Sequence, residues 1–141
     1  MTPQMLMYTL GHDFVPAGIH AGGLRYHGDS PLVSQLVHEG EAEAVAVDQT
    51  ACFAAAVQFA RAEGILPAPE ANHAVKGAID EALKCKAEGK SRTILFNLCG
   101  HGHFDMQAYI DYFGGKLQDL DYDEAELAMA LAGLPSVKEA A

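Results

Sequence analysis

A short apolar run that leads directly into a glycine-rich turn constrains the fold of this chain more than any other feature. Residues 93–98 are nearly all apolar and include β-branched and aromatic members, a pattern typical of a strand buried on both faces of a parallel sheet. The turn 99–103 (Cys-Gly-His-Gly-His) follows, and Asp105 stands where it can cap a helix predicted over 106–113. A strand, a glycine-rich turn and a helix N-terminus together indicate a site for an anion or a cofactor ring.

Helical patterns make up most of the remaining chain. Capping residues and apolar spacing predict further helices over residues 31–40, 48–63, 71–87 and about 122–132, and a second short strand over 44–47. This order predicts an α/β fold of parallel-sheet layers with flanking helices, although two strands are too few for a stable sheet. Residues 1–30 contain several glycines and no sustained period, and so long an irregular segment is usually functional or disordered. Its apolar residues favour an ordered loop.

Composition argues against several classes of partner. The chain has nine Lys and Arg residues and nineteen Asp and Glu residues. The formal net charge of −10 disfavours binding to nucleic acid and to anionic membranes. No apolar run reaches the roughly 18 residues of a membrane span. The first four residues show no positive region of a signal peptide, so we expect a cytoplasmic protein. Cys52, Cys85 and Cys99 are scattered and odd in number, as expected of reduced thiols.

The alternating residues of the turn also permit a metal interpretation. Cys99, His101, His103 and Asp105 carry ligand atoms that zinc accepts. Their spacing resembles the His-x-His-x-Asp-His box of metallo-β-lactamase-like hydrolases, but Met106 stands where that box has histidine. We therefore expect no metal site and keep a zinc-dependent hydrolase using Cys99, His101 and His103 as an alternative. A non-catalytic α/β module that binds a partner chain is the other alternative.

Two charged residues outside the turn are further candidates. Glu70 lies between a pair of prolines and a predicted helix, where an acid stabilises the helix dipole and can also face a ligand. Arg25 is one of three arginines and lies in the glycine-rich stretch 22–26. In so acidic a chain, an arginine flanked by glycines can hold an anionic substrate group.

Several motifs in register carry a family resemblance. Residues 63–74 resemble the EGI-x-PA-x-E-x-x-HA segment of tryptophan synthase β-chains, and residues 97–105 resemble the NLSG-x-G-x-x-D segment of the same enzymes. Residues 8–16 and 20–28 resemble the divergent second-type branch of these β-like enzymes. The matches extend over about residues 8–117 in the order of the family.

The resemblance implies the C-terminal portion of a pyridoxal-phosphate enzyme of fold type II, a lyase that joins indole to serine to give L-tryptophan. Cys99 stands where the family has a serine that contacts the pyridine nitrogen. A reference thiol has a pKa of about 8.5 and is neutral at neutral pH, so this role can survive. A neutral partner leaves the nitrogen largely unprotonated, which favours β-replacement over transamination. The residues implied for the cofactor are Cys99, Gly100, Glu70, Gly22 and Gly23, and the residue implied for substrate is Arg25.

The resemblance also implies that other catalytic parts lie upstream of this portion. None of the lysines stands in a motif that matches the family's Schiff-base lysine; they are Lys76, Lys84, Lys86, Lys90, Lys116 and Lys138. We therefore expect the chain alone to be inactive and to belong to a homo-oligomer or a pair of complementing chains. The expected division is an active-site loop segment (1–30), an α/β core (31–115) and an acidic helical tail (116–141).

Overall fold

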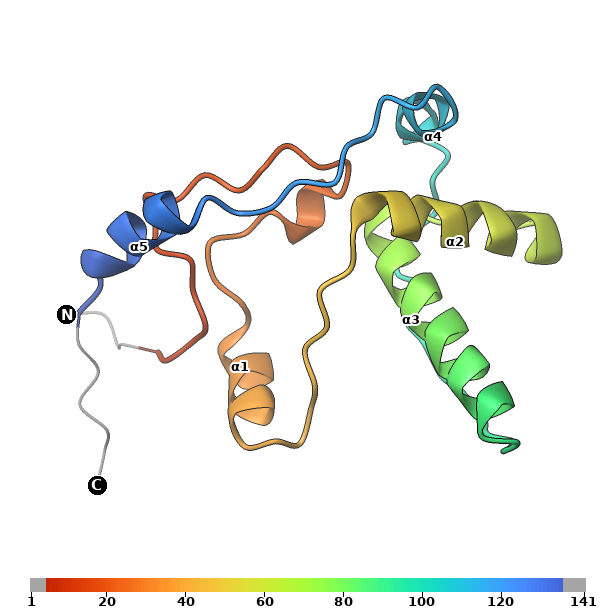
Figure 1. The fold of residues 1–141 in the computed structure, drawn as a ribbon, viewed down its shortest axis with the longest axis horizontal. Coiled ribbons are helices and arrows are strands. Elements are labelled where there is room, and N and C mark those ends of the chain that lie inside the picture. Colours follow the sequence, from red (N-terminus) through yellow and green to blue (C-terminus); the bar gives the residue numbers. More distant parts are fainter. Residues whose placement is uncertain (1–4, 136–141) are drawn as a thin grey trace. The chain divides into compact units, whose positions relative to one another are not determined.

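The computed structural model describes residues 5–135, and the chain divides into two compact units. Of the described residues, unit 1 comprises 5–18, 25–45 and 121–135, and unit 2 comprises Ile19–Leu24 and Ala46–Leu120. Within the described residues the regular structure is helical, with one short 3-10 helix, η1 (Gly22–Leu24), and five α-helices (Figure 1).

Unit 2 is built on α2 (Gln49–Glu63) and α3 (Pro69–Ala87), which pack against each other near the start of α3 and then diverge (Figure 1). Gly64 ends α2 in the left-handed conformation, with a φ of 71°, as the sequence predicts for a glycine stop. Helix α3 begins two residues earlier than predicted because Pro69 occupies its first position, where a missing N–H costs nothing. Glu70 therefore lies in the first turn of α3.

The core of unit 2 forms where α4 (Met106–Phe113) packs on α2. Phe53 is buried against two tyrosines of α4, with ring centroids 5.1 Å from Tyr109 and 5.7 Å from Tyr112. Ala56 and Ala108 are also buried there, and their small side chains let the two helices approach closely. Burying one large aromatic side chain contributes roughly 1.5 to 3 kcal/mol, so Phe53 is a principal anchor of this packing.

Unit 1 contains α1 (Pro31–His38), α5 (Glu124–Ala132) and two irregular stretches before α1, residues 5–18 and 25–30. Thr9 and Gly28 form an antiparallel bridge, which joins these two stretches. The ring of Phe14 is buried and packs edge-on against Tyr122 at 5.5 Å. Asp123 caps α5, since its side chain accepts hydrogen bonds from the N–H groups of Ala125 and Glu126.

The two predicted strands are not formed within residues 5–135. Residues 44–47 and 93–98 are irregular, and the described part contains only two isolated β-bridges. No backbone hydrogen bond joins residues 93–98 to the rest of the described chain, and Leu95 is 96% exposed. A strand exists only through hydrogen bonds to a neighbouring strand, whereas a helix satisfies its own backbone. The predicted helices are confirmed, and the predicted parallel layers are not formed among residues 5–135.

Helix α4 begins after Asp105 as predicted, but the Asp105 side chain makes no capping hydrogen bond. Residues 136–141 of the predicted acidic tail lie outside the described residues. None of the helices described between residues 5 and 135 combines the length and the apolar character that crossing a membrane requires.

Candidate functional site

The glycine-rich turn packs directly against the connection that leads to Glu70. The N–H of Ala68 donates to the carbonyl oxygen of Gly100 at 2.9 Å, and the N–H of Gly102 donates to Leu66 at 2.8 Å. Between these two bonds, Pro67 and His101 form an antiparallel bridge. The structure therefore brings together the two segments that carry Cys99 and Glu70, both of which belong to unit 2.

The loop that contains Gly22 and Gly23 reaches the same place. The N–H of Gly23 donates to Glu70 Oε1 at 2.8 Å, which fixes the carboxylate against the loop. A Cβ at Gly23 would lie 3.1 Å from Glu70 Oε1, so a side chain at this position would crowd the carboxylate. The N–H of His20 donates to Gln49 of α2 at 3.5 Å and holds the start of the loop. A Cβ at Gly22 would meet no heavy atom of the described chain within 4 Å.

Backbone atoms approach one another closely at the turn because two glycines lack a side chain. A Cβ at Gly102 would lie 2.4 Å from the carbonyl oxygen of Pro67 and 3.1 Å from the ring of Tyr109. A Cβ at Gly100 would lie 3.1 Å from the Cβ of Ala68. The first distance is incompatible with any side chain in the present backbone arrangement.

Three of the residues predicted for the cofactor meet directly or through paired segments, and the other two are their neighbours in the sequence. Gly23 contacts Glu70, Gly100 pairs with the connection before Glu70, and Cys99 carries a free, exposed thiol next to Gly100. Gly22 adjoins Gly23 in η1 (Gly22–Leu24).

Arg25 belongs to unit 1 and is not part of the arrangement just described. Its guanidinium donates to the carbonyl oxygen of Pro16 at 3.0 Å, within the same unit. The side chain is exposed, so this single hydrogen bond leaves other guanidinium donors accessible to an anion. Its predicted role toward substrate stays a prediction.

The two histidines of the turn contact each other. The N–H of His103 approaches His101 Nδ1 at 3.3 Å, and the two rings pack edge-on with centroids 4.9 Å apart. In the part of the chain that the structure describes, no three His, Cys, Asp or Glu side chains are grouped so that they could hold a metal ion. The geometry therefore does not favour the zinc-dependent hydrolase.

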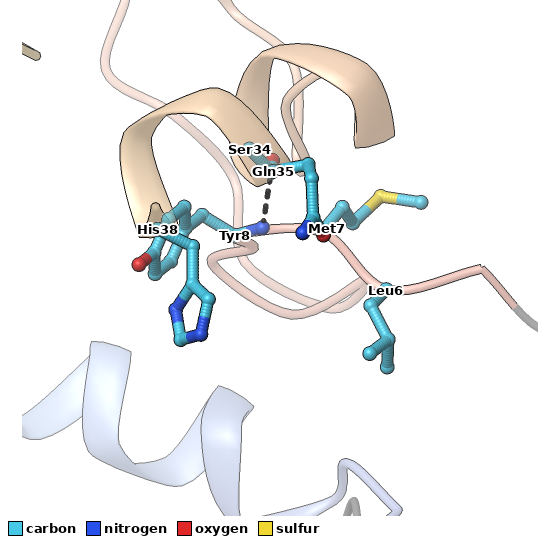
Figure 2. A pocket seen from close by; sticks show the side chains of 6 residues that line it. All are labelled: Leu6, Met7, Tyr8, Ser34, Gln35 and His38. Atoms are coloured by element: carbon cyan, nitrogen blue, oxygen red, sulfur yellow. Dashed lines mark hydrogen bonds between the residues drawn. The ribbon is translucent and has the colours of Figure 1, made fainter. Parts of the chain in front are cut away.

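Two hollows in the surface lie apart from the predicted site residues. In unit 1, a pocket of about 340 Å³ lies between residues 6–8 and α1, where the N–H of Tyr8 donates to the buried Ser34 hydroxyl at 3.1 Å (Figure 2). In unit 2, an open hollow of about 690 Å³ lies between α2 and α4. Neither is lined by a residue that the sequence predicts for cofactor or substrate.

Cys52 and Cys85 are buried, whereas Cys99 is exposed. The burial of Cys52 makes the stability of the fold depend on pH. Burial raises the pKa of the Cys52 thiol from an ordinary value of 9.0 to about 11, against the opposing effect of Lys76. The unfolded thiol ionises near pH 9 and the folded thiol near pH 11. The stability from this group is therefore complete below pH 9 and is lost as the pH rises towards 11.

We expect alkaline titration from pH 9 to 11 to lower the free energy of unfolding by about 2 to 3 kcal/mol through Cys52 alone. Urea denaturation at several pH values measures the slope, and Cys52→Ala is the control that removes the ionisable group. Equal slopes for the two proteins would contradict the prediction.

Several residues of this arrangement were not singled out by sequence reasoning. Gly102 is visible in the sequence only as one glycine of a turn, and Tyr109 as one apolar residue of a helix. Asn72 is completely buried, and its side-chain oxygen lies 3.1 Å from the Tyr109 hydroxyl. The one indication in the sequence is that Asn72, a polar residue, lies on the apolar side of the helix predicted over 71–87.

Comparison with known proteins gives a consistent result. A family model described as "Pyridoxal-phosphate dependent enzyme" matches residues 9–100. The tryptophan synthase beta chain 2 of Methanosarcina acetivorans is 65% identical over 117 residues, which cover 83% of this chain and 26% of that protein. The corresponding protein of Aquifex aeolicus is 64% identical over 84% of this chain and 27% of its own length.

A third relative, the tryptophan synthase beta chain of Thermococcus gammatolerans, is 55% identical over 122 residues, which cover 86% of this chain and 28% of that protein. The chain thus spans little more than a quarter of the length of these curated relatives. Because the family model matches more than half of the chain, this chain belongs to the pyridoxal-phosphate dependent enzymes.

Proposed function

We propose that this chain is the C-terminal portion of a tryptophan-forming, pyridoxal-phosphate dependent lyase and that it supplies contacts to the cofactor ring. The observation that carries the proposal is the convergence of residues 66–70, 100–102 and the Gly23 loop in unit 2. These are the segments whose motifs resemble the family, and they come from three separate regions of the sequence. Their convergence is unexpected for motifs that match by accident.

The residues at this place fit a pyridine ring. Gly100 has no side chain to prevent a flat ring from approaching the backbone, and the neighbouring Cys99 thiol is exposed. The Gly23 N–H orients the Glu70 carboxylate by a charge-assisted hydrogen bond. When bound, pyridoxal phosphate supplies an electron sink for the chemistry at the substrate. In this proposal Cys99 gives the ring nitrogen a neutral partner, and Arg25 binds an anionic group of the substrate.

The proposed fold of the complete enzyme includes the parallel-sheet layers predicted from the sequence. Residues 93–98 have the composition of a buried strand, yet Leu95 is 96% exposed and the segment has no backbone partner among the described residues. Phe104, in the following turn, is 93% exposed. We expect neighbouring strands from the remainder of the enzyme to cover this surface, whether they belong to the same polypeptide or to a complementing chain. The same proposal includes the division of the chain into an active-site loop segment (1–30), an α/β core (31–115) and an acidic helical tail (116–141).

The lysines of the described part do not offer a substitute for the family's covalent lysine. Of the five lysines in the described part, Lys76, Lys84, Lys90 and Lys116 each lie in an ion pair with a nearby carboxylate. The fifth, Lys86, is exposed in the last turn of α3. Covalent attachment of the cofactor requires a lysine with a depressed pKa beside it. We therefore place this lysine, and the formation of tryptophan from serine and indole, in the complete enzyme.

The experiment compares the chain alone with a chimera in which the chain replaces the matching 117 residues of the Methanosarcina acetivorans relative. With pyridoxal phosphate, serine and indole, the chain alone is expected to form no tryptophan above the free-cofactor background. The chimera is expected to bind the cofactor, detected by its absorbance, and to form tryptophan. The intact relative is the matched control. Turnover by the chain alone, or a folded chimera that binds no cofactor, would overturn the proposal.

A further inference from the structure

We infer that Tyr109 is a positioning residue for the proposed cofactor-ring site, because it holds the glycine-rich turn against the connection that leads to Glu70. The inference deepens the proposed function and rests on it for the meaning of the site. Tyr109 lies in α4, outside the motifs that resemble the family, and its hydroxyl bonds to Pro67 and Asn72, neither of which is predicted for the cofactor. Its effect would pass through residues 66–68 and 100–102.

The hydroxyl of Tyr109 makes the first connection. The side chain is 3% exposed, and its hydroxyl donates to the carbonyl oxygen of Pro67 at 2.6 Å. Burial raises the pKa of this hydroxyl above its ordinary value, so it keeps its proton and remains a donor. Pro67 lies three residues before Glu70 on the connection that enters α3. A bond to its carbonyl group therefore restrains the path of the backbone into Glu70.

The ring of Tyr109 makes the second connection. Its Cε2 atom lies 3.1 Å from the position that a Cβ would take at Gly102, so the ring closes over the backbone of the turn. Phe53 packs edge-on against the same ring at 5.1 Å and supports it through the core. One side chain thus contacts the segment of Glu70 with its hydroxyl and the segment of Cys99 with its ring. Displacing the ring or removing the hydroxyl should loosen one segment relative to the other.

Asn72 makes a second polar contact with the Tyr109 hydroxyl. Asn72 is fully buried, its Oδ1 atom lies 3.1 Å from the Tyr109 hydroxyl, and its Nδ2 atom has no hydrogen-bond partner among the described residues. A hydroxyl has one proton to share between Pro67 and Asn72. An unsatisfied buried amide destabilises a fold, so an apolar residue would pack here at lower cost. The arrangement is accounted for if the amide and the hydroxyl together direct the Tyr109 side chain at Pro67.

The test compares Tyr109→Phe with Tyr112→Phe. The second variant makes the same chemical change three residues later in the same helix. Tyr112 packs on Phe53, and its hydroxyl makes no hydrogen bond within residues 5–135. In the 141-residue chain, Tyr109→Phe should speed hydrogen exchange at the N–H groups of Ala68 and Gly102 about tenfold, the ratio expected for the loss of one hydrogen bond. Tyr112→Phe should leave both exchange rates unchanged.

A second measurement separates positioning from stability in general. In the chimera defined above, at a temperature well below unfolding, Tyr109→Phe should change the absorbance spectrum of the bound cofactor and lower kcat about tenfold, with KM for indole retained. Tyr112→Phe should change neither. Unaltered exchange at Ala68 and Gly102, or an unaltered spectrum and kcat in Tyr109→Phe, would overturn the inference. Failure of the proposed function is distinct, because the chimera without substitutions would then bind no cofactor while the exchange experiment still decides how the turn is held.

Discussion

Gly102→Ala is expected to lower the free energy of unfolding of the chain by about 3 kcal/mol, through overpacking and the loss of a buried hydrogen bond. A Cβ at this position would lie 2.4 Å from the carbonyl oxygen of Pro67, and a backbone atom cannot rotate out of the way. Relief requires the turn to move away from the connection. That movement would weaken the bond from Gly102 to Leu66 and separate Pro67 from the Tyr109 hydroxyl.

Urea denaturation followed by circular dichroism measures this change, and Gly77→Ala is the matched control. Gly77 lies inside α3, and a Cβ there would meet no heavy atom within 4 Å among the described residues. The same substitution should therefore stabilise the helix by about 0.5 to 1 kcal/mol, since alanine restricts the unfolded chain and favours helix. A Gly102→Ala protein within about 0.5 kcal/mol of the original would show that the turn does not pack against Pro67 as described.

Cys99→Asp is expected to lower the rate of tryptophan formation by the chimera about a hundredfold, the scale on which one misplaced electrostatic partner changes an enzymatic rate. Cys99→Ser should retain the rate within a few-fold, because a hydroxyl is also a neutral hydrogen-bonding partner. An aspartate would place a negative charge beside the ring nitrogen and favour its protonated form. The expected consequence is a changed cofactor spectrum and a shift of product away from β-replacement.

The measurement is the ratio of tryptophan to other products from serine, together with the spectrum of the bound cofactor. His103→Asp is the charge-matched control, since it places the same group on an exposed side chain of the same turn. A general effect of acidity near the turn would lower the rate equally in both variants. Equal rates for Cys99→Ser and Cys99→Asp would instead show that Cys99 does not contact the ring nitrogen, and would contradict the proposed site.

The sequence predicts correctly those features of the fold that depend only on residues close together in the chain. The predicted stop at Gly64 and the predicted bounds of α4 agree with the structure, because capping, glycine conformation and apolar spacing act within a few residues. Helix α3 begins two residues before its predicted start, because Pro69 occupies the first helical position and not the connection in which the sequence pattern places it. The strands were predicted from composition, but pairing depends on segments far away in sequence or outside this chain, and residues 93–98 remain unpaired in the described part.

The sequence by itself determined the helices and, through motifs in register, the family to which the chain belongs. It also marked Glu70, Gly23 and Gly100 as candidates, without showing that they meet. Only the tertiary structure decided how the turn is held. The Tyr109 hydroxyl bonds to Pro67, 42 residues away, and nothing in the apolar pattern of α4 distinguishes this tyrosine from an ordinary core residue. Local preferences follow from neighbouring residues, whereas a buried hydrogen bond between distant segments exists only after packing has brought donor and acceptor together.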